Sequence, residues 1–428
     1  MSASLSNPQT QIAYLGLALI TVCATYLLPF IPQSQSGTFY IVIHVVLTGL
    51  MFALWRSKEL DIKTVLLVGL LLRIVLIPSP IFSSNDSERY LWDGAVALAG
   101  LDPYTVAPNM PEAAELRKLW ATPEEHSAYP TLYPPGALFL FALSALAGPV
   151  KGVWLWKIFA TVASLISLLI GYDLLKRRGL LRHLPLLALS PLLILETGVG
   201  AHLDAFCVLA VVLTLSLCDR EKLLLAGIII GWSASIKFLP AIIAGPLIFY
   251  LRPKPALTLL ISSLITITAI YAIAFASGFQ ALGLLPVFFE KWRNGAPIYN
   301  LLEYIFSPSM LLWVVAIIAL GLFALSTLKA RKGHIMLALS ITLSVPLLLS
   351  PVVFPWYLTV LVPLIALRPS AALLCWVSTA PFGYIVLNKW LSEGVWEPAV
   401  WPLWLTAIGL VVGLLWDISY QKSVKPSV

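Results

Sequence analysis

The chain has 428 residues, of which 60% are apolar and only 11% are Asp, Glu, Lys or Arg. Soluble domains carry roughly a quarter of charged residues, so this chain has too few charges to cover the surface of a soluble protein. Its varied apolar content also excludes disordered and collagen-like chains. The net charge of +7 comes without a dense basic patch, so no nucleic acid partner is expected. We therefore predict an all-α, polytopic transmembrane helical bundle that forms one integral-membrane domain over residues 1–428.

Hydropathy predicts about 12 to 14 membrane crossings, because a span needs about 20 apolar residues or fewer where helices break. Two long regions, 184–218 and 223–251, are predicted to be hairpins of shorter helices, and a further run covers 354–368. The stretch 136–149 is predicted to be an interfacial or re-entrant helix, because a crossing there would place Lys176, Arg177 and Arg178 outside. The single spans are predicted at 11–31, 38–55, 64–81, 152–175, 256–277, 309–328, 333–350, 371–388 and 399–417.

The basic residues predict the orientation, because Lys and Arg collect in cytoplasmic loops. A cytoplasmic position for the connections that hold most of them places both termini inside and the acidic loops outside. These connections are 56–63, 176–183, 219–222, 252–255, 329–333, 368–370 and 418–428. We expect the cytoplasmic (inner) membrane, with the active site facing the periplasm or the cell exterior.

The outer loop 82–135 carries the first candidate site. Asn85 followed by Glu88 predicts a capping box and a helix start. On that helix Asp86, Tyr90 and Asp93 share one face, and Arg89 can reach both carboxylates. An ionised carboxylate at a partly dry site can act as a general base. A solvated surface helix with ordinary ion pairs is the alternative, and short amphipathic helices are expected to follow within the loop.

Other outward-facing groups are candidates with plainer alternatives. His202 and Asp204 follow Glu196 at the break of the first hairpin, where they either serve a site or brace a turn; two ligands are too few for a metal site. Lys237 either meets a lipid phosphate or extends to the interface. Lys291 and Arg293 of a second outer loop suit either anion binding or interfacial anchoring. Trp356 and Tyr357 either belong to the aromatic belt or line a lipid groove.

Several motifs, taken in order, resemble the bacterial polyprenol-phosphate-mannose-dependent mannosyltransferases of the GT-C superfamily. The first-loop motif is the most specific, the resemblance covers roughly residues 80–410, and relatives often carry His at the position of Phe354. The motifs are Asp86-x-x-Arg89-Tyr90-x-Trp92-Asp93-Gly94, Gly100-Leu101-Asp102-Pro103-Tyr104, Tyr133-Pro134-Pro135, Gly200-Ala201-His202-Leu203-Asp204, Lys237-Phe238-Leu239-Pro240 and Pro355-Trp356-Tyr357.

The resemblance implies an inverting transfer of a sugar, expected to be mannose, from a polyprenyl-phosphate carrier to an acceptor hydroxyl. Asp86 would be the general base, and Lys237, Lys291 or Arg293 would hold the donor phosphate. The acceptor would be a glycolipid, a glycan or a protein, and no cofactor is expected, although a divalent cation stays open. The substrate-binding set would comprise Glu88, Arg89, Tyr90, Asp93, Tyr104, Tyr133, His202, Asp204, Lys237, Lys291, Arg293, Trp356 and Tyr357.

Three other functions fit the same sequence. A related transferase would use glucose, arabinose or aminoarabinose on the lipid carrier. A transporter or lipid flippase would favour ionisable residues near mid-span and repeats between halves, whereas Arg73 is the one clear mid-span charge and no repeat is evident. A membrane scaffold would use the loop 82–135 to bind another protein.

Overall fold

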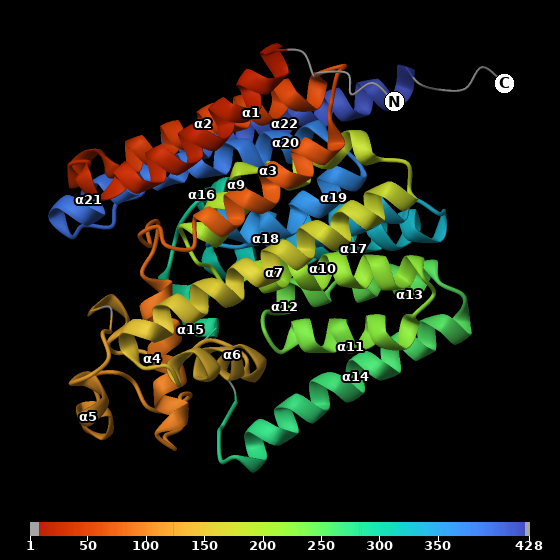
Figure 1. The fold of residues 1–428 in the computed structure, drawn as a ribbon. Helices are drawn as coiled ribbons and strands as arrows, with labels where there is room; N and C mark the ends of the chain where they lie inside the picture. The colour runs from red at the N-terminus through yellow and green to blue at the C-terminus, as the bar shows by residue number, and fades with distance from the viewer. Residues whose placement is uncertain (1–7, 123, 282, 284, 424–428) are drawn as a thin grey trace.

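The computed structural model describes residues 8–122, 124–281, 283 and 285–423 of the chain (Figure 1). Within these ranges the regular structure is helical throughout, apart from one isolated β-bridge between Asn294 and Val352. The predicted all-α fold is confirmed. The two termini, whose orientation we predict, lie outside the described residues.

Seven helical segments of the described chain are long and apolar enough to cross a membrane, and they match seven of the nine predicted single spans. Five are α2 (Gln33–Arg56), α7 (Pro149–Arg177), α14 (Pro253–Ala276), α17 (Pro308–Arg331) and, over Trp401–Ser419, α22 (Trp401–Ser423). The other two combine consecutive helices. They are Ala13–Phe30, from α1 (Pro8–Leu27) and η1 (Leu28–Phe30), and Ala371–Glu393, from α20 (Ala371–Thr379), η6 (Ala380–Ile385) and α21 (Val386–Glu393).

The two remaining predicted spans form shorter helices. The span expected at 64–81 is the 14-residue helix α3 (Ile62–Val75), and the span expected at 333–350 is the 15-residue helix α18 (Ile335–Leu349). Pro78 and Pro80 follow α3 and end it early, whereas α18 begins only after the turn at Gly333, whose φ is 84°, and ends before Pro351. Each of these two helices is therefore shorter than a full span.

The long apolar regions break into short helices at the predicted places, and the first also breaks before Pro191, a break that sequence reasoning did not predict. The region 184–218 contains α8 (Leu184–Ala188), preceded by η4 (Leu181–His183), then α9 (Pro191–Gly198) and α10 (Asp204–Asp219). The region 223–251 contains α11 (Leu223–Ala234), α12 (Phe238–Ala241) and α13 (Ala244–Tyr250). The run at 354–368 contains η5 (Pro355–Leu361) and α19 (Val362–Leu367). Such breaks free backbone and side-chain polar groups inside the bundle, where a site can form.

The helices pack so that the outer loop gathers at one end of the bundle. In Figure 1, α1, α2, α20 and α22 lie along one side, α11 and α14 lie along the opposite side, and α7 runs between them. The helices α4 (Asp86–Leu98), α5 (Ala114–Arg117) and α6 (Pro135–Ala145) cluster at one end of α7. Short helices η2 (Pro111–Ala113) and η3 (Glu124–His126) complete this loop, and α15 (Leu285–Lys291) and α16 (Pro297–Ile305) form the second loop.

The first outer loop is fixed by a close helix contact and an aromatic core. A Cβ atom on Gly94 would lie 2.5 Å from the backbone of Phe141, so glycine allows α4 to approach α6 closely. Tyr90 stacks on Phe141 with ring centroids 4.5 Å apart, and both rings pack edge-on against the buried Trp156 of α7. This aromatic core holds the first turns of α4 against the bundle.

Candidate active site

The helix α4 begins at Asp86, as predicted, but the capping box is wrong. The Asn85 side chain makes no cap hydrogen bond; its amide donates instead to the carboxylate of Glu125. The backbone N–H of Glu88 donates to the carbonyl of Asn85 at 3.0 Å, and the N–H of Asp86 donates to the Ser84 hydroxyl at 3.3 Å. The start of α4 is therefore tied to the end of the loop rather than capped by its own side chain.

Asp86 is the outermost member of a chain of polar groups. Its side chain is 22% exposed, and its Oδ2 atom lies 3.4 Å from Nδ1 of His202 and accepts a hydrogen bond from the Tyr90 hydroxyl at 3.3 Å. Burial alone raises the pKa of Asp86, but the contact with His202 and the positive charge of Lys237 outweigh it and hold the pKa below its usual range. The carboxylate is therefore ionised and partly open.

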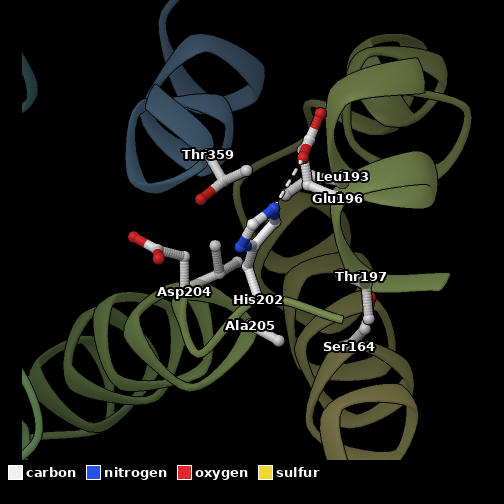
Figure 2. A pocket seen from close by; sticks show the side chains of 9 residues that line it. Ser164, Leu193, Glu196, Thr197, His202, Asp204, Ala205 and Thr359 are labelled. Atoms are coloured by element: carbon white, nitrogen blue, oxygen red, sulfur yellow. Dashed lines mark ion pairs between the residues drawn. The ribbon is translucent and has the colours of Figure 1, made fainter. Parts of the chain in front are cut away.

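His202 lies between two carboxylates in the break between α9 and α10. Its Nδ1 faces Asp86, and its Nε2 lies 3.3 Å from Oε2 of the fully buried Glu196. Figure 2 marks the pair of His202 and Glu196 with a dashed line. Burial alone lowers the pKa of His202, but its contacts with Asp86 and Glu196 outweigh this and raise the pKa from 6.5 to about 9. The imidazole is therefore a buried cation between two anions.

The backbone of this break is shaped to admit the imidazole. A Cβ atom on Gly200 would lie 2.5 Å from Cδ2 of His202, so only glycine leaves room for the ring. Ala201 has a φ of 51°, and its carbonyl accepts a hydrogen bond of 2.7 Å from the indole of Trp156. On its face the His202 ring stacks on Trp356, with centroids 3.9 Å apart and planes 12° from parallel.

Lys237 forms a second pair beside the first. Its ammonium lies 2.9 and 3.1 Å from the two oxygens of the buried Asp204 and 3.8 Å from the centroid of the Tyr357 ring. The Lys237 side chain is 26% exposed. Asp204 begins α10 and Lys237 precedes α12, so two helix breaks bring these residues together.

Arg89 and Asp93 are directed away from Asp86. Arg89 pairs with Asp93 at 2.9 Å, not with Asp86, and donates to the carbonyl of His126 at 3.2 Å. The Thr131 hydroxyl donates to Asp93 at 2.6 Å. The expectation that Arg89 bridges both carboxylates is therefore wrong, because this buried pair instead joins α4 to the end of the outer loop.

The remaining first-loop candidates surround α4. The Tyr104 hydroxyl donates to the carbonyl of Tyr133 at 3.0 Å, and the Tyr133 ring packs edge-on against Tyr90 at 5.3 Å. Burial and the charge of Glu125 raise the pKa of Glu88. Tyr133 thus lies near the catalytic candidate through Tyr90.

The second outer loop contacts the first at Tyr129. Within the part of the chain that the structure describes, Lys291 and Arg293 form no ion pair with Asp86. Lys291 donates to the Tyr129 hydroxyl at 3.2 Å, and Trp292 packs edge-on against the same ring. Arg293 pairs with Glu303 at 3.0 Å and donates to backbone carbonyls at the end of α15. Lys291 is thus held by Tyr129, and Arg293 is held by Glu303.

Glu196 is a member of the site that sequence reasoning did not select. It lies on α9 with 1% of its side chain exposed, and its Oε1 accepts a hydrogen bond of 2.7 Å from the Tyr384 hydroxyl and lies 3.6 Å from Nε2 of His44. Its place six residues before His202 in a broken hairpin was the available signal. Local spacing does not reveal contacts with α2 and η6, which come from distant parts of the chain.

A small cavity lies behind His202 (Figure 2). Its volume is about 10 Å³, enough for about one water molecule, and it is lined in part by Glu196, His202, Asp204 and Thr359. A sugar does not fit in this cavity, and the exposed part of the cluster is the side chain of Asp86. Among the described residues, no three His, Cys, Asp or Glu side chains converge as a metal site requires.

Comparison with known families places the chain. Residues 14–252 match the model of the MptA_B family, described as alpha-(1->6)-mannopyranosyltransferase, N-terminal domain. The chain belongs to this family. It is thus a mannosyltransferase of GT-C type, as the first-loop motifs suggested, and its apolar helices make it a multi-pass membrane protein. A search of curated proteins found no match.

The matched segment covers only part of the candidate site. Asp86, Glu196, His202, Asp204 and Lys237 lie within residues 14–252. The residues that come from beyond it are Lys291, Arg293, Trp356, Tyr357 and Tyr384.

Proposed function

We propose that this mannosyltransferase moves mannose, with inversion, from a polyprenyl-phosphate carrier to an acceptor hydroxyl at the outer face of the cytoplasmic membrane. The observation that carries the proposal is the Asp86 carboxylate, which is partly exposed and kept ionised beside the His202 cation. A general base must be ionised and accessible to the substrate, and the lowered pKa and partial exposure of Asp86 support this role.

In the proposed step one proton moves to Asp86 and one electron pair leaves with the phosphate. The acceptor oxygen attacks the anomeric carbon on the face opposite the phosphate, and its proton moves to the Asp86 carboxylate. The bond between the anomeric carbon and the phosphate oxygen breaks, and its electron pair leaves with the polyprenyl phosphate. A single displacement of this kind inverts the anomeric configuration.

The leaving phosphate gains negative charge, so a cation beside it lowers the barrier. Lys237 supports this role, because its ammonium is partly exposed and lies beside the Tyr357 ring. Two of its contacts go to Asp204, so the pair stays neutral until an anion arrives. Lys291 and Arg293 of the second loop are further candidates, which would have to leave Tyr129 and Glu303 to reach a phosphate.

The other candidates position the base and the acceptor. Tyr90 orients Asp86 directly, while Arg89 and Asp93 fix the helix that carries it. Glu88, Tyr104, Tyr133 and Trp356 are proposed to contribute to the sugar or acceptor site. The acceptor is a glycolipid, a glycan or a protein, and no cofactor or metal is required by the proposed step.

The test is sugar transfer by the full-length protein in membranes. Wild type should transfer mannose from polyprenyl-phosphate mannose, should be inactive with GDP-mannose, and should be unaffected by a chelator. Asp86→Asn should lower the rate by about a hundredfold or more while expression persists, since general-base catalysis contributes about 10² to 10⁴. Glu115→Gln is the matched control, because Glu115 is an exposed acid of the same loop.

Three results would contradict parts of this proposal. Wild-type rates for Asp86→Asn would remove Asp86 as the base. Faster transfer from a glucose, arabinose or aminoarabinose carrier would replace mannose as the donor sugar. Retention of the anomeric configuration, read by NMR of the product, would exclude a single displacement.

A further inference from the structure

Glu196 is a carboxylate buried inside the protein. Its side chain is 1% exposed, and a buried charge without a partner is strongly destabilising. Two protein groups offset that cost. His202 lies 3.3 Å from Oε2, and the Tyr384 hydroxyl donates to Oε1 at 2.7 Å. Glu196 therefore requires a positive neighbour, and His202 is the nearest basic nitrogen.

The same imidazole reaches the proposed general base on its other side. A doubly protonated ring carries an N–H on each nitrogen, so a charge held by Glu196 leaves one N–H on the side of Asp86. Both carboxylate contacts are ionic rather than aligned hydrogen bonds, and Nε2 also lies 3.3 Å from the Ser83 hydroxyl. Ring stacking fixes this direction. His202 lies flat on Trp356, and Trp356 lies flat on Phe354 with centroids 4.4 Å apart and planes 1° from parallel. The ring therefore does not turn away without breaking the stack.

We propose that Glu196 is a positioning residue, which acts through His202 to keep Asp86 ionised and directed toward the acceptor. The proposal rests on the proposed role of Asp86 as general base. Glu196 does not touch the substrate. Its carboxylate keeps the proton on His202, and His202 in turn favours the charged form of Asp86 before transfer.

Several other titratable groups face Glu196, His202 and Asp86. From α2 come Tyr40 and His44, from η6 comes Tyr384, from α4 comes Tyr90, and from η3 comes His126. Tyr133 lies beside Tyr90, and Lys237, Asp204 and Tyr357 face the group from the side of α10, α12 and η5. Lys237 also favours the ionised form of Asp86, so loss of Glu196 weakens the arrangement without abolishing it.

The expected pH dependence follows from the sign of each shift. The pKa of His202 is raised to about 9, so its pairing is complete below its ordinary value of 6.5 and is lost as pH rises through about 9. The pKa of Asp86 is lowered, so its ionised form persists above its ordinary value of 3.8 and is lost only in stronger acid. Above pH 9 the Asp86 carboxylate stays ionised but loses the His202 cation that directs it, so the rate should fall on the alkaline side with a midpoint near pH 9.

The experiment measures kcat and KM against pH for wild type, Glu196→Gln and Glu196→Asp in nanodiscs. Glu196→Gln keeps the shape but removes the charge, so the alkaline limb should move down by about one pH unit or more, with KM nearly unchanged. Glu196→Asp keeps the charge and should restore much of the wild-type profile. Glu115→Gln should match wild type throughout. An unmoved alkaline limb in Glu196→Gln, with wild-type kcat, would overturn the proposal.

A second measurement does not depend on catalysis. Titration of ¹⁵N-labelled histidine by NMR, with His202 assigned through His202→Asn, should give a His202 pKa near 9 in wild type and a lower value in Glu196→Gln. An equal pKa in both proteins would overturn the inference even if Glu196→Gln proved too unstable for kinetics. If wild type transfers no sugar from a polyprenyl phosphate, the proposed function fails, while the titration still decides whether Glu196 controls His202.

Discussion

Two carboxylates on the same helix, Asp86 and Asp93, lie in opposite environments. Asp86 is partly exposed, and its pKa is held below the usual range by His202. Asp93 is buried, and burial raises its pKa despite the charge of Arg89 and the hydroxyl of Thr131. Environments that push two pKa values apart separate chemical roles. At the scale of the residue, Asp86 is thus fit for proton transfer and Asp93 for holding the loop.

Lys237 offers a test of the donor phosphate site. Lys237→Met should destabilise the protein by roughly 3 kcal/mol, because it leaves the Asp204 carboxylate buried without its partner. The double variant with Asp204→Asn should regain most of that stability, since no unpaired charge remains. If Lys237 holds the donor phosphate, the double variant should still show a raised KM for the lipid-linked donor. Thermal inactivation and donor saturation curves measure the two effects.

The stability of the double variant reports the structural role of Lys237, and its donor KM reports the binding role. A double variant with wild-type stability and wild-type donor KM would show that Lys237 serves only to neutralise Asp204. Lys237→Arg retains the charge and provides the control for charge alone.

At the scale of the element, helix breaks and close helix contacts bring the site residues together. The breaks before α10 and α12 place Asp204 and Lys237 side by side, and the break after α9 admits His202. The sequence predicted these breaks, because glycine, proline and ionisable residues interrupt long apolar runs there. The sequence did not predict which side chains pair at these helix ends. Asn85 pairs with Glu125, and Asp204 pairs with Lys237, and in both cases the partners lie in different segments of the chain.

The contact of α4 with α6 should control the position of Asp86. Gly94→Ala places a Cβ atom 2.5 Å from the Phe141 backbone, which rigid backbone does not accommodate, so a cost of about 1–3 kcal/mol is expected. The shift of α4 should lower kcat more than it raises KM. Thermal stability and steady-state kinetics measure this. Gly16→Ala is the control, because open space surrounds Gly16 in α1, and equal behaviour of the two variants would contradict the expectation.

At the scale of the whole molecule, the distribution of charge predicts how the bundle sits in the membrane. Basic residues concentrate at connections such as those after α7 and α17, whereas the loop with α4 to α6 is acidic. The orientation that follows places Asp86 outside, where a lipid-linked donor would supply the sugar without a nucleotide.

Site-directed labelling tests this orientation. In a background with Cys23, Cys207, Cys218 and Cys375 replaced by serine, Glu115→Cys should react with an impermeant maleimide in intact cells. Lys332→Cys, at the end of α17, should react only after the membrane is opened. Comparison of intact and permeabilised cells measures this, and the reverse pattern would invert the predicted topology.

The sequence predicted the class of the molecule better than the composition of its site. Length and hydropathy are local properties, so most spans and both hairpins were predictable. Prolines after α3 and the turn at Gly333 before α18 shortened two spans that hydropathy alone predicted as full length. Glu196, His44 and Tyr384 meet only in the folded bundle, because they come from α9, α2 and η6. No spacing rule connects them.

The stack of His202 on Trp356 has a consequence for the order in which the protein is made. Asp86, Glu196 and His202 all emerge from the ribosome before Trp356, which covers the imidazole, and before Tyr384, which donates to Glu196. The early helices must therefore enter the bilayer while a cluster of charges is still incompletely enclosed. The centre is complete only once these later segments have been added, so a chain that stops short of Trp356 contains the reactive groups but leaves one face of the imidazole bare.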